Sequence, residues 1–302
     1  MQLLTAGRQN VSALAFAPAG DALAAACSYS SPLLWALPAT GDPRALQNPP
    51  AYSSSSFTFS PDAAVVGWIA GQERYEFDRG TGATRKVRLA PPDEGLNSQA
   101  VCRPAARLIL RTVERNVGFR IRGLAPDGTE WREAWTVGPD NELSGWELAP
   151  SGADRFFVWE RGWNSLTGRR LAAPSALTGE VQAVTAVPSL SLSGLAAAPD
   201  GSAVVGFDAS SLYSWRVGEK VQKVRTGTLK HYRALAFHPD GRHLLAGNND
   251  TTARLIDTQT WQVVRQYTWD VGRLSAVAVS PDGALAAAGG AKGKVVVWDL
   301  DL

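Results

Sequence analysis

The sequence predicts an all-β protein built from seven similar units, and three observations support this class. A short pattern recurs along the chain, in which an apolar run is followed by proline, a small or acidic residue, often glycine, and a second apolar run. The apolar runs are rich in Val, Ala, Leu and Phe, have the length of strands and lack the helical period of 3.6. Successive turn prolines lie 40 to 49 residues apart, and they are Pro18, Pro61, Pro104, Pro150, Pro199, Pro239 and Pro281.

Each copy of the pattern predicts a strand, a tight turn and a second strand. Proline sets φ at the second turn position, aspartate supports the turn with its side chain, and glycine adopts positive φ. The six clear copies span residues 14–26, 57–69, 146–158, 195–207, 235–247 and 277–289, with a weaker one at 101–110. A repeat of 40–45 residues is typical of a four-stranded propeller blade. We therefore expect one domain over residues 1–302, a seven-bladed β-propeller, with 125–128 as the third-to-fourth strand turn of blade three.

The two ends of the sequence fit the same scheme. The segment Lys294–Leu300 has the place of a third strand in blade seven, and no fourth strand follows it. Residues 2–6 precede blade one where a fourth strand would lie. We expect the N-terminal strand to complete the last blade and to close the ring, which hides the exposed strand edges of an open arrangement.

The third strands resemble those of the WD-repeat family. Blade seven carries the dipeptide Trp298-Asp299 that names the family, and bulky residues occupy the same position in blades one, two, five and six. These are Trp35, Phe77, Trp215 and Ile256. The resemblance covers the whole chain and is closest in blades one, two, five, six and seven. It implies that these side chains pack between adjacent blades. It also implies that a partner protein binds to the loops and that the propeller catalyses no reaction.

The hydrogen-bonded set that the resemblance implies within each blade is incomplete here. The family's histidine before the first strand is replaced by Gly7, Thr228 and Asp270 in blades one, six and seven. We expect stability to rest mainly on apolar packing, with the Asp250–Thr252 pair as the best remnant of the polar set.

Composition limits the function classes. The net charge is +2, and 45% of residues are hydrophobic, which argues against disorder, nucleic-acid binding and binding to an anionic membrane. Cys27 and Cys102 favour two reduced buried thiols over one disulfide. The segment before Cys27 is broken by Pro18 and Asp21, which favours strands over a signal peptide. We expect a monomeric, cytoplasmic protein, from a GC-rich and bacterial source by its Ala, Arg and Gly usage.

Catalysis is not expected. The sequence has no nucleophile elbow, phosphate loop or dinucleotide motif, and 289–293 has the pattern of a hairpin turn. His238 and His243 could face each other across a hairpin, but neither cysteine is spaced to complete a metal site. We therefore interpret both, with His231, as surface or packing residues and expect no cofactor. The alternative is a hydrolase or lyase with a site in the central channel.

The favoured function is a non-catalytic scaffold that binds a protein or peptide on one loop face. That face, here the predicted face, carries the fourth-to-first and second-to-third strand loops. Its proposed contacts are Tyr52, Arg115, Glu160, Arg161, Trp163, Tyr232, Arg233 and Trp269, since Trp, Tyr and Arg are common interface anchors. Trp163 lies in an enlarged loop of blade four, near residues 160–166, where packing on its own blade is slightly favoured over a partner contact. Arginines in blades three and four could suit an acidic partner, but neighbouring glutamates favour a solvated surface of mixed charge.

Overall fold

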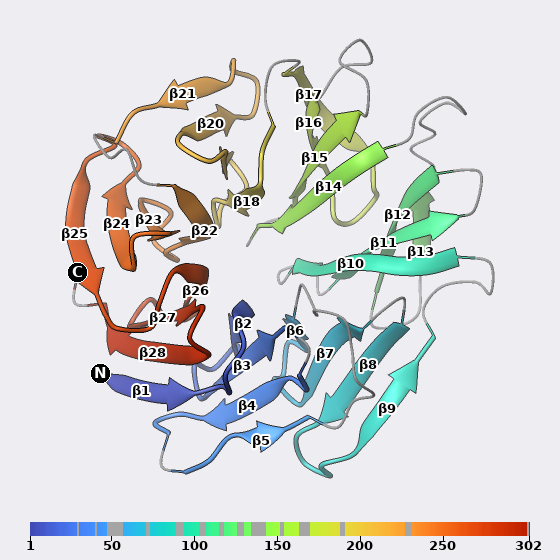
Figure 1. Ribbon diagram of the computed structural model, residues 1–302. Helices are drawn as coiled ribbons and strands as arrows, with labels where there is room; N and C mark the ends of the chain where they lie inside the picture. The colour runs from blue at the N-terminus through green and yellow to red at the C-terminus, as the bar shows by residue number, and fades with distance from the viewer. Residues whose placement is uncertain are drawn as a thin grey trace. The chain divides into compact units, whose positions relative to one another are not determined.

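The computed structural model is composed of β-strands (Figure 1). It describes residues 1–28, 30–39, 41–46, 57–70, 73–88, 94–102, 107–114, 118–125, 130–133, 143–151, 154–162, 170–187, 191–226, 231–300 and 302. These residues group into two compact units, Met1–Val87 with Arg225–Leu302, and Arg88–Val224. No helix of the length and apolar character needed to cross a membrane occurs within these ranges. A single domain over 1–302 stays a prediction.

The first unit holds four antiparallel four-stranded sheets. Blade one has β2 (Val11–Phe16), β3 (Ala22–Cys27), β4 (Leu33–Ala36) and β5 (Arg44–Ala45). Blade two has β6 (Phe57–Phe59), β7 (Val65–Ala70), β8 (Glu73–Asp78) and β9 (Thr84–Val87). Blade six has β22 (Tyr232–Phe237), β23 (His243–Asn248), β24 (Thr252–Asp257) and β25 (Val263–Thr268). Blade seven has β26 (Leu274–Val279), β27 (Leu285–Gly290), β28 (Lys294–Asp299) and β1 (Gln2–Thr5).

The second unit holds three sheets of the same kind. Blade three has β10 (Glu94–Cys102), β11 (Arg107–Glu114), β12 (Gly118–Leu124) and β13 (Glu130–Glu133). Blade four has β14 (Leu143–Pro150), β15 (Phe156–Gly162), β16 (Arg170–Pro174) and β17 (Val181–Ala186). Blade five has β18 (Gly194–Ala197), β19 (Ala203–Phe207), β20 (Leu212–Arg216) and β21 (Gln222–Val224). Each sheet contains the paired first and second strands predicted from the repeat. Residues 126–128 of the predicted third-to-fourth strand turn of blade three lie outside the described residues.

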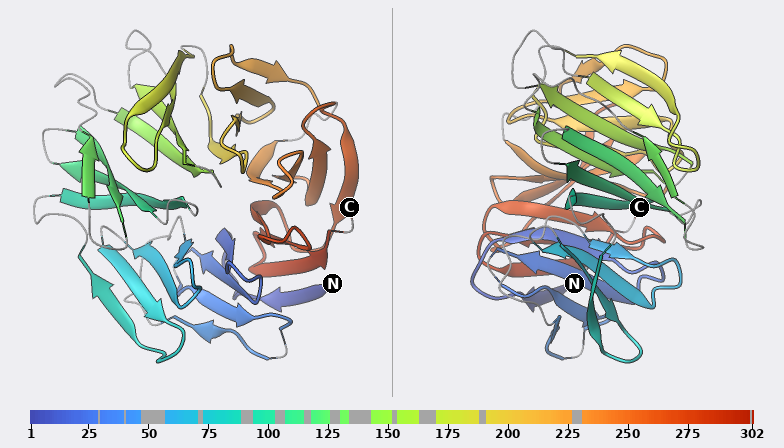
Figure 2. Two further views of the ribbon diagram at one scale, coloured as in Figure 1. Left: turned by 180° about the vertical axis from the view of Figure 1, so that it is seen from behind. Right: turned by 90° about the vertical axis from the view of Figure 1, so that its right-hand side faces the viewer.

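Blade seven is completed by the N-terminal strand, as predicted. β1 pairs antiparallel with β28, with Gln2 opposite Val297 and Thr5 opposite Lys294. The Ala6 N–H extends the ladder by donating to the Gly293 carbonyl at 2.8 Å. In Figures 1 and 2 the first strand (blue) runs beside the last (red). The backbone groups at the outer edge of β28 are therefore paired rather than exposed.

The bulky third-strand residues are buried between neighbouring blades, as the family resemblance implied. Trp35 of blade one lies in one apolar cluster with Val295 and Val297 of blade seven. Phe77 of blade two packs with Leu34 of blade one, and Trp298 with residues of blade six. In the second unit, Trp215 is 1% exposed and meets Phe157 of blade four edge to face at 5.9 Å between centroids. Cys27 is also buried as expected, and burial raises the pKa of its thiol.

Blade two contains a buried charge. Arg74 on β8 is 5% exposed, and its guanidinium donates to Glu76 at 3.0 Å and to the Thr58 hydroxyl at 3.1 Å. Burial lowers the pKa of Arg74, and the neighbouring Glu76 carboxylate opposes that effect. Gly67 provides the space, since a Cβ there would lie 2.2 Å from the guanidinium. This ion pair is therefore shielded from water by the sheet around it.

We predict that Glu76→Gln destabilises the protein by about 2 kcal/mol or more, because a buried guanidinium loses its counter-charge. The matched control is Glu73→Gln on the same strand, whose ion pair with Lys86 is exposed and should cost at most about 1 kcal/mol. Urea unfolding of the two variants measures the difference. Equal losses would contradict the assigned role of burial.

Asp257, at the end of β24, joins a turn to a neighbouring side chain. One carboxylate oxygen accepts the N–H groups of Gln259 and Thr260, and the other accepts both Nε and Nη2 of Arg242 at 2.8 and 2.6 Å. The Arg242 hydrogen bonds are the main reason that the pKa of Asp257 falls to about 2, with the turn N–H groups adding to the effect. The folded state therefore favours the ionised carboxylate.

This shift predicts a pH-dependent contribution to stability. An unfolded aspartate protonates near pH 4, so the contribution of Asp257 is complete above that pH and is lost as pH falls through about 2. The melting temperature of Asp257→Asn should lie below that of the wild type above pH 4, and the two should converge towards pH 2. Melting curves between pH 6 and pH 2 measure this, and a gap that is independent of pH would contradict it.

Candidate functional site

Among the proposed contact residues on the predicted face whose side chains the structure describes, one is exposed. Arg233 occupies a β-bulge in β22, where the pairing with β23 shifts between Tyr232 and Ala234. The same bulge occurs near the start of the first strand in four other blades. A bulge turns an additional residue out of the ladder, and in blade six this residue is the arginine. Its role in binding stays a prediction.

Tyr232 and Trp269 pack inside the fold. Tyr232 is 2% exposed and its hydroxyl is hydrogen-bonded to the Thr226 hydroxyl. Burial raises the pKa of Tyr232. Trp269 is half-buried, stacks on Tyr267 with ring centroids 5.7 Å apart, and lies 4.3 Å from the Trp298 ring. Tyr232 is thus buried and Trp269 is partly exposed, and their proposed contacts with a partner stay predictions.

Blade four differs from the prediction in where its second strand ends. β15 continues to Gly162, so Glu160 and Arg161 are strand residues opposite Trp146 and Gly145 rather than members of an enlarged loop. The strand pairing with β14 extends further than the turn pattern indicated. Tyr52, Arg115 and Trp163 lie outside the described residues, and their proposed contacts stay predictions.

The polar remnant expected in blade six is present. The Thr252 hydroxyl donates to Asp250 at 2.5 Å, and Arg254 donates to the other carboxylate oxygen at 2.9 Å. Partial burial alone would raise the pKa of Asp250, but these hydrogen bonds from Thr252 and Arg254 lower it. In blade seven, Asp270 replaces the family's histidine and pairs with Lys292 on the β27–β28 turn. These contacts fix the second-to-third strand turns at the predicted face.

A groove lies at the opposite end of the strands, between blades one and seven. Its volume is about 430 Å³, and we call it the one–seven groove. The residues that line it are Met1, Gln2, Ala19, Gly20, Asp21, Leu37, Pro38, Leu285, Val297, Trp298 and Asp299. They come from the first-to-second strand turn of blade one, the segment after β4, and the ends of β27, β28 and β1. The groove is therefore on the face that the sequence analysis did not select.

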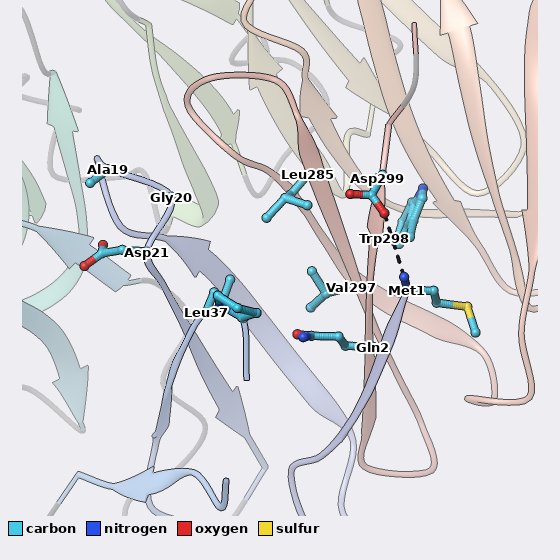
Figure 3. Close-up of a pocket in the computed structure, with 11 residues that line it drawn as sticks. Met1, Gln2, Ala19, Gly20, Asp21, Leu37, Leu285, Val297, Trp298 and Asp299 are labelled. Carbon is cyan, nitrogen blue, oxygen red and sulfur yellow. Dashed lines mark ion pairs between the residues drawn. The ribbon is translucent and has the colours of Figure 1, made fainter. Parts of the chain in front are cut away.

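The groove has an apolar floor between two acidic sides. Figure 3 shows Leu37, Val297 and Leu285 between Asp21 on one side and Asp299 on the other. The Asp21 carboxylate is 50% exposed and pairs with Arg79 at 2.8 Å. The Asp299 carboxylate is 67% exposed and lies 3.8 Å from the Met1 amino group (Figure 3). An extended apolar segment with basic side chains would match this arrangement.

Backbone contacts position the blade-one side of the groove. The Leu37 N–H donates to the Asp21 carbonyl at 2.7 Å, which ties the segment after β4 to the β2–β3 turn. Gln2 of blade seven accepts the Ala39 N–H at 3.1 Å and links the same segment to the N-terminal strand. The groove is therefore a product of the pairing of β1 with β28.

Two groupings of residues in the first unit were not among the predicted sites. The groove residues are distant in sequence, and no local pattern joins Asp21 to Asp299. His238 and His243 were interpreted as surface or packing residues, and the structure brings both to the Asp240 carboxylate, with ligand atoms of all three within 4.8 Å of one another. The spacing His-x-Asp-x-x-His was visible in the sequence, and counting Asp240 as a ligand would have identified this cluster.

Two comparisons with known proteins agree with the architecture. Residues 222–257 and 261–299 match the family model described as WD40: WD domain, G-beta repeat. A crystal structure of the Cps50 (Swd1) beta-propeller domain from Myceliophteria thermophila is similar over 99% of each chain, with a TM-score of 0.75 and 15% sequence identity. The recognition of WD repeats and the all-β fold class are thus confirmed. Residues 222–257 and 261–299 carry WD40 repeats, and the described residues form seven four-stranded sheets with the fold of a β-propeller.

Proposed function

We propose that this protein is a non-catalytic interaction scaffold that binds a peptide segment with basic side chains in the one–seven groove. The observation that carries the proposal is the apolar floor of the groove between two exposed carboxylates. Propellers with WD40 repeats are in general scaffolds for protein interaction, which supports the same class of function. The lining of the groove indicates which kind of peptide would bind, namely one with apolar and basic side chains.

The floor and the sides of the groove contribute differently to binding. Leu285 and Leu37 are half-buried and Val297 is 3% exposed, so the floor is preformed and covering it removes apolar surface from water. The side carboxylates favour arginine, whose planar guanidinium donates two parallel hydrogen bonds to a carboxylate. Apolar contact supplies affinity, and the charges select the orientation and sequence of the peptide.

Both side carboxylates remain accessible to a partner although each already has a cation nearby. Ion pairs between exposed groups contribute at most about 1 kcal/mol. A guanidinium from a bound peptide can therefore replace or share the contact that Arg79 makes with Asp21. Asp299 at the other side is more exposed and its pair is longer, at 3.8 Å.

Selection from a library of random ten-residue peptides tests the proposal. Peptides retained by the wild type should combine Arg or Lys with apolar residues. The double variant Asp21→Lys, Asp299→Lys should bind them about tenfold more weakly, since two exposed charge contacts are together worth about 1.4 kcal/mol. Fluorescence anisotropy with a labelled selected peptide measures the affinities.

Two variants serve as controls in the same measurement. Glu219→Lys changes an exposed acid of blade five that does not line the groove and should leave binding unchanged. Arg233→Glu changes the predicted face. Loss of binding with Arg233→Glu, and not with the double variant, would place the docking site on the predicted face and refute the groove.

A further inference from the structure

A cluster of two imidazoles and a carboxylate lies at the turn between β22 and β23. It consists of His238, Asp240 and His243, in the stretch His-Pro-Asp-Gly-Arg-His. Two other blades have serine at the position of His238. In blades two and seven, Ser60 and Ser280 donate to Asp62 and Asp282 of their own turns at 2.6 and 2.5 Å. Blade six thus carries the same turn with a hydroxyl replaced by an imidazole.

Asp240 is held so that one carboxylate oxygen faces both imidazoles. Its Oδ1 accepts the backbone N–H groups of Arg242 at 2.8 Å and His243 at 3.0 Å. Its Oδ2 lies 3.0 Å from Nδ1 of His238 and 2.6 Å from Nδ1 of His243. The Arg242 guanidinium is directed to Asp257 instead. The turn itself therefore aims Oδ2 at the two nitrogens.

The contacts of His238 determine which of its nitrogens carries the proton. Nε2 lies 3.1 Å from the Gly283 carbonyl of blade seven, and a carbonyl oxygen can only accept, so Nε2 carries hydrogen. The Asp240 N–H donates to Nδ1 at 3.2 Å, so Nδ1 presents its lone pair. That lone pair then faces the Oδ2 lone pairs at 3.0 Å. A positive charge at Nδ1, from a proton or from a metal ion, stabilises two electron-rich atoms at this distance.

The imidazole ring of His238 packs closely against Gly283 of blade seven. Gly283 has a φ of 78°, and a Cβ at this position would lie 2.3 Å from Nε2 of His238. The side chain of His238 is 12% exposed and that of His243 18% exposed. Histidines that bind metals usually donate their other ring N–H to a backbone carbonyl or carboxylate, which fixes the ring. His238 already has that arrangement.

We propose that His238 Nδ1, His243 Nδ1 and Asp240 Oδ2 form a binding site for a divalent transition-metal ion of the zinc class. Imidazole nitrogens with one carboxylate oxygen suit Zn²⁺, Co²⁺ and Ni²⁺ better than Mg²⁺ or Ca²⁺. Ligand atoms around a tetrahedral ion with bonds of about 2.0 Å are roughly 3.3 Å apart, so the distances from Oδ2 to the two nitrogens, 3.0 and 2.6 Å, must lengthen to admit the ion. On binding, the His243 proton moves from Nδ1 to Nε2 through solvent.

Two features of Asp240 support the site. An aspartate carboxylate is ionised at neutral pH and is available as a ligand. It is also 34% exposed, which leaves the fourth coordination position open to water or to a group on a partner.

Isothermal titration of untagged protein with Zn²⁺ tests the proposal, with Co²⁺ absorption as a second readout of the coordination geometry. The wild type should bind one ion per chain in this site, with the visible spectrum of tetrahedral Co²⁺. Asp240→Asn preserves the turn contacts and removes the ligand charge, and His243→Gln removes one nitrogen. Each should lower the affinity at least about tenfold, and should reduce the rise in melting temperature that Zn²⁺ produces.

His231→Gln is the matched control, since this third histidine is exposed and lies outside the cluster. It should bind Zn²⁺ as the wild type does. The absence of saturable Zn²⁺ binding in the wild type would overturn the proposal, as would an equal loss in His231→Gln. Melting curves without metal verify that each variant is folded, and Asp240→Asn provides the test if His243→Gln is not.

Discussion

The packing of one blade against the next is the interaction on which the rest of this structure depends. A four-stranded sheet has two faces, and here both faces of the inner strands are buried. Every residue of β3, Ala22–Cys27, is buried, and so is all of β27 except its first residue. Such strands are stable only when apolar neighbours cover both sides. Alanine and glycine in these strands permit close approach, and the third-strand residues Trp35, Phe77 and Trp298 fill the remaining space.

Because the faces of the sheets are occupied by packing, chemistry is confined to the ends of the strands. The turns there share one design, in which an aspartate accepts nearby N–H groups, as Asp62, Asp200 and Asp282 do. Small changes in this shared turn produce different local chemistry. A serine before the proline gives a closed hydrogen-bonded turn, whereas His238, with His243 after it, gives a set of three ligand atoms. Repetition thus supplies a constant support on which single residues can vary.

Residues near each other in sequence were the predictable part of the candidate sites. The Asp250–Thr252 pair, two residues apart, was expected and is present. Placement that depends on a neighbouring blade was not predictable. Tyr232 and Trp269 have the residue types of interface anchors, yet each packs within the first unit, against Thr226 and Trp298 respectively. The burial of such rings depends on how close another blade lies, and one sequence carries no measure of that distance.

The sequence by itself determined the number of blades, the strand–turn–strand units and the pairing of β1 with β28, because turn chemistry and strand alternation act over a few residues and recur with a constant period. The tertiary structure decided which side chains are accessible and which distant groups meet. The one–seven groove joins Asp21 to Asp299, and the Gly283 carbonyl fixes the ring of His238 from another blade. These contacts depend on the packing of whole sheets, and that packing balances the volumes of many side chains at once.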